Sequence, residues 1–235
     1  MEFKAILADT LQKAGISFDE AQLSRAALFT EKLLEINESM NLTAITENAA
    51  MAEKHWLDSL AAGRVRLAKE RVLDVGSGAG FPGIPLHIAF PEADFTLLDS
   101  LQKRLNFIGD ACAFADIPVP VLLHARAEEA GRDKDYREQY DTVISRAVAN
   151  LTTLCEYCLP FVKVGGRMIA YKGPDAENEL AAAKGAIGKL GAEVDCIEHF
   201  VLPSGEERNL ILIAKHSPCA PCYPRNPKAI KNKPL

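Results

Sequence analysis

The stretch "VLDVGSGAGFPG", Val72–Gly83, places four glycines within eight residues directly after a short apolar run. Glycine lacks a Cβ and adopts positive φ without strain, so such a series suits a tight strand-to-helix turn that comes close to a ligand. We therefore predict a strand that ends at Asp74 and a ligand-binding loop that follows it.

Short apolar runs alternate with helical patterns from Arg71 onward. The runs are "RVLDVG", "DFTLLDS", "VPVLLHA", "YDTVISRA", "GGRMIAYKG", "AEVDCIEHFVLP" and "RNLILIAKH". Such a rhythm is typical of repeated βαβ units, which form a parallel sheet flanked by helices. The last two runs are joined by "SGEE", Ser204–Glu207, with no helix between them. We expect an α/β fold with a mostly parallel seven-stranded sheet and a C-terminal antiparallel hairpin.

The chain before this section has a helical pattern. Ser17 and Glu20 have the spacing of a capping box, and apolar residues recur at helical intervals after them, which predicts a helix over residues 19–38. The segment "NLTAIT" interrupts the pattern, and a second helix is predicted in "AAMAEKHWLDSLAAGRVR", residues 49–66. We divide the chain into an N-terminal helical extension (1–68), an α/β domain (69–216) and a basic C-terminal tail (217–235).

The charge of the chain is unevenly distributed. A net charge of -5 argues against a protein that simply coats nucleic acid. From Arg208 to Leu235, however, there are six basic residues and no Asp or Glu, so this end carries +6. Such a block can contact phosphates even on an acidic protein, whereas the alternative is a solvated, frayed tail. Charge alone leaves both interpretations open.

The apolar runs and the cysteines bear on location and metal content. No run approaches the ~20 apolar residues of a membrane span, and the N-terminus is unlike a secretory leader, so we expect a cytoplasmic protein without membrane contact.

Two C-x-x-C pairs, Cys155 with Cys158 and Cys219 with Cys222, have the composition of a four-thiolate zinc site. The first pair lies in an apolar helical pattern and the second in a proline-rich tail. We therefore predict free thiols and no metal.

Two kinds of ligand fit the glycine series. Gly78, Gly80 and Gly83 satisfy G-x-G-x-x-G, and Asp99 ends the next strand, where an acid accepts the ribose hydroxyls of a dinucleotide. The pattern D-x-G-x-G-x-G, which starts at Asp74, is instead typical of class I methyltransferases, in which the carboxylate reaches toward the ammonium of S-adenosylmethionine. A pyrophosphate site would not place a carboxylate there, so we favour S-adenosylmethionine.

Most of the chain from Asn41 to Leu235 resembles one family, the glucose-inhibited division protein B family of bacterial 16S ribosomal RNA guanine-N7 methyltransferases. The matching segments are "NLTAIT", "HWLDSL", "DVGSGAGFPGIPL", "LLDS" followed by "KR", "ARAEE", "ISRA", "YKG", "ERNLILI" and "YPRNPKAIKNKPL". The resemblance implies a class I, Rossmann-like fold and methyl transfer from S-adenosylmethionine to N7 of a guanine. The implied partner is 16S ribosomal RNA or the small ribosomal subunit, and we expect a monomer. The alternative is a non-catalytic RNA-binding or ribosome-assembly factor with the same fold.

The implied chemistry needs no general base. Guanine N7 already presents a lone pair, so positioning and electrostatics suffice. The chain reads "SRA", Ser145–Ala147, where enzymes that methylate exocyclic amines carry an Asn/Asp-Pro-Pro-aromatic loop. The residues predicted to bind the cofactor are Asp74, Gly78, Gly80 and Asp99, and the resemblance implies that Gly76, Phe81, Ala127, Glu128 and Arg146 also bind it. The residues predicted to be catalytic are Arg146, Lys172 and Arg208.

Several of these residues have a structural alternative. Arg146 could belong to an ion pair, and Phe81 could be ordinary core. Lys172 and Arg208 are expected to hold phosphate or the target base, but each could be a solvated charge at a strand end. His55 and Asp58, one helical turn apart, are interpreted as a helix-capping pair that holds "NLTAIT" near the active face.

Overall fold

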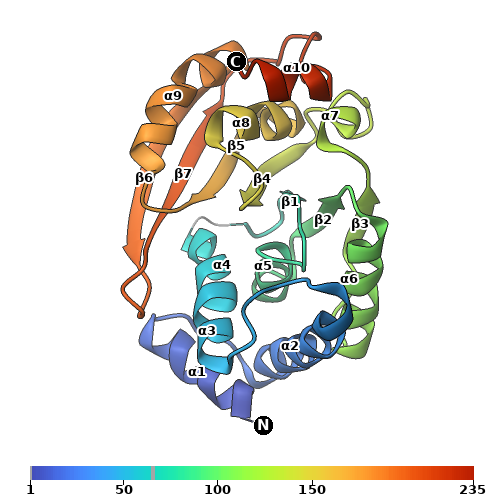
Figure 1. The fold of residues 1–235 in the computed structure, drawn as a ribbon, viewed down its shortest axis with the longest axis vertical. Helices are drawn as coiled ribbons and strands as arrows, with labels where there is room; N and C mark the ends of the chain where they lie inside the picture. The colour runs from blue at the N-terminus through green and yellow to red at the C-terminus, as the bar shows by residue number, and fades with distance from the viewer. Residues whose placement is uncertain (1, 65–66) are drawn as a thin grey trace.

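The computed structural model describes residues 2–64 and 67–235. Its sheet has the order β3-β2-β1-β4-β5-β7-β6 (Figure 1). The strands are β1 Arg71–Val75, β2 Asp94–Asp99, β3 Val121–His124, β4 Tyr140–Arg146, β5 Val162–Lys172, β6 Ala192–Val201 and β7 Glu207–Lys215. The first five are parallel, and β7 pairs antiparallel with both β5 and β6. The predicted α/β fold with its terminal hairpin is confirmed.

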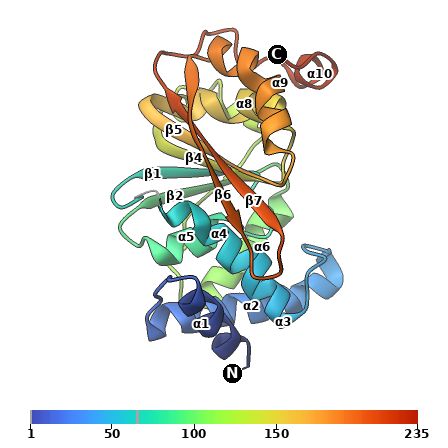
Figure 2. The same cartoon turned by 90° about the vertical axis from the view of Figure 1, so that its left-hand side faces the viewer.

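Helices cover both faces of the sheet (Figure 2). One face packs against α1 Glu2–Lys13, α2 Glu20–Met40, α5 Gly83–Ala89 and α6 Gln102–Phe114. The other packs against α7 Ala127–Ala130, α8 Leu151–Cys158 and α9 Ala176–Lys189. Successive strand residues point to opposite faces, so Val72 belongs to the first core and Leu73 to the second. The predicted helical extension thus shares a core with the sheet, and the boundaries drawn at residues 68 and 216 stay predictions.

The strand order reverses at β1, which lies between β2 and β4. The chain runs outward from β1 through β2 to β3 and then returns to the other side of β1 for β4. In open α/β sheets, ligands bind outside the carboxyl ends of the strands at such a switch point. The glycine-rich loop follows β1 and therefore lies at this position.

The start of α2 differs from the predicted capping box. Asp19, not Ser17, is the N-cap: its side chain accepts a hydrogen bond from the Gln22 amide, and the Gln22 side chain accepts one from the Asp19 amide. The Ser17–Glu20 interpretation is wrong because an aspartate and a glutamine two residues further on satisfy the same two donors. The helix itself, expected over 19–38, is confirmed over Glu20–Met40.

The second N-terminal helix is not a regular α-helix. It consists of α3 Asn48–Met51, a π-helical turn at Ala52–Leu57, α4 Asp58–Leu60 and a 3-10 turn at Ala61–Arg64. The last two residues of the predicted helix, Val65 and Arg66, lie outside the described residues. Within the described ranges, no helix has both the length and the apolar character needed to cross a membrane.

The C-terminal tail is folded onto the body of the protein. Arg225 forms several hydrogen bonds with Glu156 of α8, whose side chain is 1% exposed, and Ile230 of α10, Pro227–Asn232, is fully buried. Arg137 donates to the backbone carbonyls of Cys219 and Tyr223. The interpretation of the tail as a frayed appendage is therefore wrong.

Candidate active site

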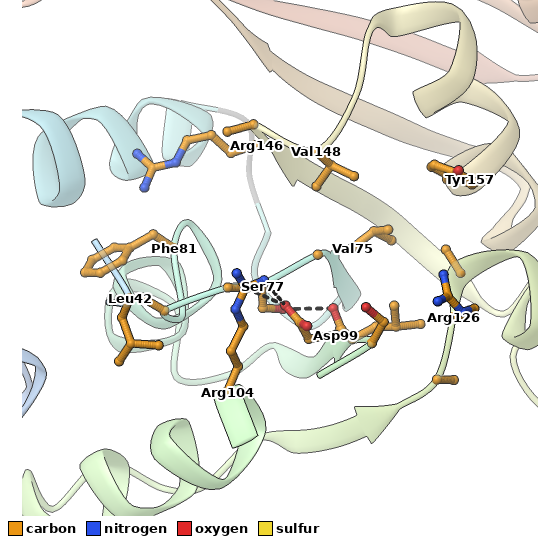
Figure 3. Close-up of a pocket in the computed structure, with 18 of the residues that line it drawn as sticks. Leu42, Val75, Ser77, Phe81, Asp99, Arg104, Arg126, Arg146, Val148 and Tyr157 are labelled. Carbon is orange, nitrogen blue, oxygen red and sulfur yellow. Dashed lines mark hydrogen bonds and ion pairs between the residues drawn. The ribbon is translucent and has the colours of Figure 1, made fainter. Parts of the chain in front are cut away.

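A cavity of about 470 Å³ opens where the glycine-rich loop leaves the sheet (Figure 3). Gly76 and Gly78 line it, and both have left-handed φ values, 78° and 58°. A Cβ built on Gly78 would meet only the Gly76 carbonyl oxygen, at 3.9 Å, so it would project into open space. This bare backbone is available to a ligand.

The other glycines of the loop have packing roles. A Cβ on Gly76 would lie 2.4 Å from Cγ2 of Val148, and one on Gly80 would lie 2.8 Å from Cγ1 of Ile84. Gly80 does not line the cavity. The structure therefore brings Gly76 and Gly78 to the candidate site and uses Gly80 to let the loop pack against α5.

Asp99 lines the cavity at the end of β2 and fixes the loop. Its carboxylate accepts hydrogen bonds from the amides of Gly78, at 2.9 Å, and Leu101, at 2.8 Å. Arg104 Nη1 lies 3.4 Å from the same carboxylate, whose side chain is 3% exposed. Asp99 is thus held rigidly beside the bare backbone of Gly78, and its contact with a ribose stays a prediction.

Asp74 lies beneath the loop rather than in the cavity. Its Oδ2 accepts a hydrogen bond from the Gly83 amide at 3.0 Å, while its Oδ1 is buried without a hydrogen-bond partner. Burial raises the pKa of this carboxyl to about 7. Asp74 does not line the cavity, and its bond to the Gly83 amide supports the glycine loop. Its predicted contact with the cofactor stays a prediction.

The far wall of the cavity comes from the β3–α7 region and α8. Ala127 and Glu128, both predicted to bind the cofactor, line the cavity at the start of α7. Arg126 and Tyr157 lie on the same side, opposite Phe81 (Figure 3). The structure therefore brings two sequence-distant predictions, the glycine loop and the "ARAEE" segment, to one cavity.

Arg146, at the end of β4, connects the sheet to the N-terminal helices. Its Nη1 donates to Asp58 Oδ2 at 2.9 Å and to the Lys54 carbonyl at 3.0 Å. The π-helical turn makes this possible, because the Asp58 amide donates to the carbonyls of Glu53 and His55 instead of that of Lys54. Arg146 thus forms an ion pair and also lines the cavity, so its predicted cofactor-binding and catalytic roles stay predictions.

His55 is neutral and bound at both ring nitrogens. Its Nδ1 lies 3.1 Å from Nη2 of Arg146, which can only donate, so Nδ1 accepts and the proton lies on Nε2. Nε2 then donates to the Thr43 hydroxyl at 2.8 Å. Burial, followed by the Arg146 charge, lowers the pKa of His55 to about 3. The ring also stacks on Phe81, with centroids 4.6 Å apart.

The interpretation of His55 and Asp58 as a helix-capping pair is wrong, because both lie inside a continuous helical segment. The predicted attachment of "NLTAIT" is nevertheless found, since His55 binds Thr43. Leu42 of this segment lines the first cavity and Ile45 lines a second one.

The second cavity, of about 850 Å³, adjoins the first. The two share His55, Arg146, Ala147 and Val148 in their walls. Lys172 and Arg208, predicted to act on the substrate, both line the second cavity and not the first. The structure therefore separates the predicted residues into a cofactor group and a second group on the far side of Arg146.

Both cations of the second group are ion-paired. Lys172 Nζ lies 2.7 Å from Glu179 Oε2 and 2.7 Å from the Ala149 carbonyl. Arg208 Nη2 donates to Glu206 at 2.6 Å, and its Nε lies 3.6 Å from Asp58 Oδ1. Because Lys172 is buried in this way, its interpretation as a solvated strand-end charge is wrong.

Sequence reasoning missed some residues of the two cavities. The sequence indicates His55 and Asp58 only as a capping pair, and for Leu42 and Ile45 the quoted segment "NLTAIT" is the only available signal. Glu179 and Glu206 had none, because nearby acids such as Glu177 and Glu207, which line neither cavity, look the same in the sequence.

The cysteines do not form a metal site in the part of the chain that the structure describes, where no cluster of three or more potential ligands occurs. Cys155, Cys158 and Cys219 are buried, and Cys222 is exposed. Burial raises the pKa of Cys155 to about 12, which keeps this thiol protonated.

Comparison with known proteins gives a family match. Residues 22–211 match the model described as "rRNA small subunit methyltransferase G". Two curated relatives named Ribosomal RNA small subunit methyltransferase G are similar throughout. The protein from Alkaliphilus metalliredigens is 43% identical over 238 residues, covering 100% of both chains, and that from Halalkalibacterium halodurans is 45% identical over 228 residues, covering 96% of both.

A solved structure shares the fold. The chain superposes on TYW2 of M. jannaschii in complex with AdoMet with a TM-score of 0.53, covering 68% of this chain and 75% of that one. The two are 14% identical, so the likeness concerns the fold alone.

Proposed function

Since the chain belongs to the rRNA small subunit methyltransferase G family, we propose that it methylates N7 of a guanine in 16S ribosomal RNA. The methyl donor of this class is S-adenosylmethionine, so the dinucleotide alternative is wrong. A ribosomal substrate supports a cytoplasmic location. We further propose that the enzyme is a monomer.

The first cavity fits S-adenosylmethionine. The open space above Gly78, beside the fixed carboxylate of Asp99, is the observation that carries the proposal. A backbone without side chains there admits an adenosine, and a carboxylate at the end of β2 accepts hydrogen bonds from ribose hydroxyls. Ala127 and Glu128 would border the adenine of the cofactor, and Gly76 and Phe81 would border the rest of the cofactor.

The surroundings of the cavity suit attack by a neutral nitrogen. When bound, S-adenosylmethionine supplies an electrophilic methyl carbon, to which the N7 lone pair bonds while the carbon–sulfur bond breaks. The base is then left with a positive charge. His55 has no free acceptor, because Arg146 and Thr43 occupy its ring nitrogens. The contacts of His55 hold Arg146 and Phe81 in place. A reaction without a general base depends on such positioning of the reacting groups.

The alternative of a non-catalytic RNA-binding or assembly factor is not favoured. Such a factor would have no need for an open cavity over Gly78, yet this glycine has left-handed φ and an unobstructed face. The relatives that match 96–100% of this chain are named as methyltransferases, which also favours an enzyme.

The proposal is tested with methyl-labelled S-adenosylmethionine and two substrates from a strain that lacks the modification, namely small ribosomal subunits and deproteinised 16S RNA. We expect labelled 7-methylguanosine from at least one substrate and none from either in the presence of excess S-adenosylhomocysteine. Label in any other nucleoside, or in none, would contradict the assignment to N7.

A further inference from the structure

The second cavity carries charges of both signs. Its charged side chains are Lys54, Asp58, Arg146, Lys172, Glu179, Glu206 and Arg208. The four cations are paired with the three carboxylates, as described for Arg146, Lys172 and Arg208, and Lys54 binds Glu206. The wall of this cavity therefore offers both hydrogen-bond donors and acceptors.

These charges discriminate between the two ligands that the sequence left open for Lys172 and Arg208. A phosphate presents only acceptors, so it would pair with the cations of the wall but leave the carboxylate oxygens without a donor. A guanine presents the O6 acceptor together with N1–H and N2–H donors, so it matches a wall with both kinds of group. Resting on the proposed function, we propose that the second cavity receives the target guanine base and that Asp58 and Glu179 accept hydrogen bonds from its N–H groups.

Both carboxylates have an oxygen to spare. Glu179 uses Oε2 to bind Lys172 and the Leu151 amide, and among the described residues nothing donates to its Oε1. Asp58 binds Arg146 through Oδ2, whereas Oδ1 is buried without a hydrogen-bond partner and has only Arg208 Nε nearby, at 3.6 Å. An unsatisfied buried carboxylate oxygen is costly unless a ligand completes its bonding.

The position of the cavity suits a base that must reach the cofactor. Arg146, Ala147 and Val148 line both cavities, so the two cavities meet along these three residues. Ala147 has a left-handed φ of 58°, and Val148 is held against Gly76 of the glycine loop. Lys172 fixes this shared segment by binding the Ala149 carbonyl, and Glu179 does so by accepting from the Leu151 amide. A base in the second cavity therefore lies beside the cofactor cavity, at the edge that the two cavities share.

The carboxylates also suit the reaction. Methylation at N7 places a positive charge on the purine and makes its N–H groups stronger donors. A carboxylate that accepts from those groups is therefore bound more tightly in the transition state than in the ground state, which raises kcat. Cations alone at the same position would oppose this charge.

The test uses Glu179→Gln and, as a second variant, Asp58→Asn, each of which removes one negative charge and keeps the shape. Glu70→Gln is the matched control, because Glu70 pairs with Arg167 at 2.7 Å outside both cavities. Three quantities are measured: S-adenosylhomocysteine affinity by calorimetry, kcat and KM for 7-methylguanosine formation on unmodified small subunits, and the salt dependence of subunit binding.

For a guanine pocket we expect kcat to fall at least tenfold in both cavity variants, with S-adenosylhomocysteine affinity within twofold of wild type and an unchanged salt slope. The control keeps wild-type values. The retained affinity also shows that each variant is folded, and either variant alone suffices if the other fails to fold.

A phosphate pocket predicts the opposite sign, because removal of a carboxylate lessens repulsion: subunit binding would tighten and its salt slope would steepen. That result, or wild-type kcat in folded variants, would overturn the guanine pocket while leaving the proposed function intact. If the wild-type protein formed no 7-methylguanosine at all, the proposed function would be overturned and this inference with it.

Discussion

The two adjoining cavities are built in different ways. One side of the first is consecutive backbone, since the glycine loop after β1 leaves an open face at Gly78 that the Asp99 carboxylate holds in place, and the β3–α7 region and α8 add the far wall. The second owes its shape to side chains from the second N-terminal helix, the β4–α8 loop, the end of β5, α9 and the β6–β7 hairpin, held together by ion pairs. A site of the first kind can be found from a single motif, whereas a site of the second kind exists only in the folded chain.

The largest expected effect on cofactor affinity comes from Gly78→Val. A branched side chain would occupy the open face and adopt an unfavourable φ of 58°, so we expect S-adenosylhomocysteine affinity to fall more than a hundredfold. Gly165→Val is the matched control, because Gly165 also has positive φ but is exposed and far from either cavity wall. Wild-type affinity in folded Gly78→Val would remove the glycine loop from the site.

Asp99→Ala is expected to be the next most harmful change. It removes hydrogen bonds to a charged acceptor worth about 1.5–3 kcal/mol, which corresponds to roughly a tenfold to hundredfold loss of affinity. Asp94→Ala, an exposed aspartate at the other end of β2, serves as the control. Calorimetric titration with S-adenosylhomocysteine measures both, and an unchanged dissociation constant for Asp99→Ala would move the ribose contact elsewhere.

Arg146→Lys probes the edge that the two cavities share. Lysine keeps the charge but cannot bind Asp58, the Lys54 carbonyl and His55 simultaneously in a fixed fork. We expect S-adenosylhomocysteine affinity to fall only a few-fold and kcat on small subunits to fall about tenfold. Equal losses in both quantities would show that Arg146 serves the first cavity alone.

The smallest effect on the cofactor is expected from the C-terminal lysines. Lys228, Lys231 and Lys233 are exposed, whereas Arg225 is bound to Glu156 and must be kept in the experiment. Changing the three lysines to Ala should leave cofactor affinity unchanged and lower the salt slope of RNA binding by roughly 0.7–0.9 per lost phosphate contact.

A variant with Lys13, Lys184 and Lys189 changed to Ala has the same net charge and provides the control for the tail. If the two variants bind small subunits with the same salt slope, the tail lysines make no particular contact with RNA.

The fold could be predicted from the sequence largely because its strands are short apolar runs and its cofactor loop is a glycine series. Seven strands and the terminal hairpin follow from these local patterns. The start of α2 could not be assigned correctly, because two overlapping residue pairs, Ser17–Glu20 and Asp19–Gln22, satisfy the same capping rule and only packing decides between them.

The candidate site could be predicted in part, for a similar reason. Gly78 and Asp99 lie in a loop and at a strand end, where position follows from topology, whereas Gly76 and Glu128 are predicted from the family resemblance. The π-helical turn that frees the Lys54 carbonyl has no sequence pattern of its own. Likewise, a partner such as Glu179 for Lys172 comes from packing α9 beside β5, which no local rule specifies.

The joining of distant segments in the second cavity has a consequence for how the protein is made. On the ribosome, residues 43–58 emerge early, whereas Arg208 is synthesised some 150 residues later, on the return strand of the final hairpin. A nascent chain already holds the glycine loop and Asp99 when less than half of it has been synthesised. The cavity between Asp58 and Arg208 closes only when the hairpin arrives, so a growing chain lacks its second cavity until translation is almost finished.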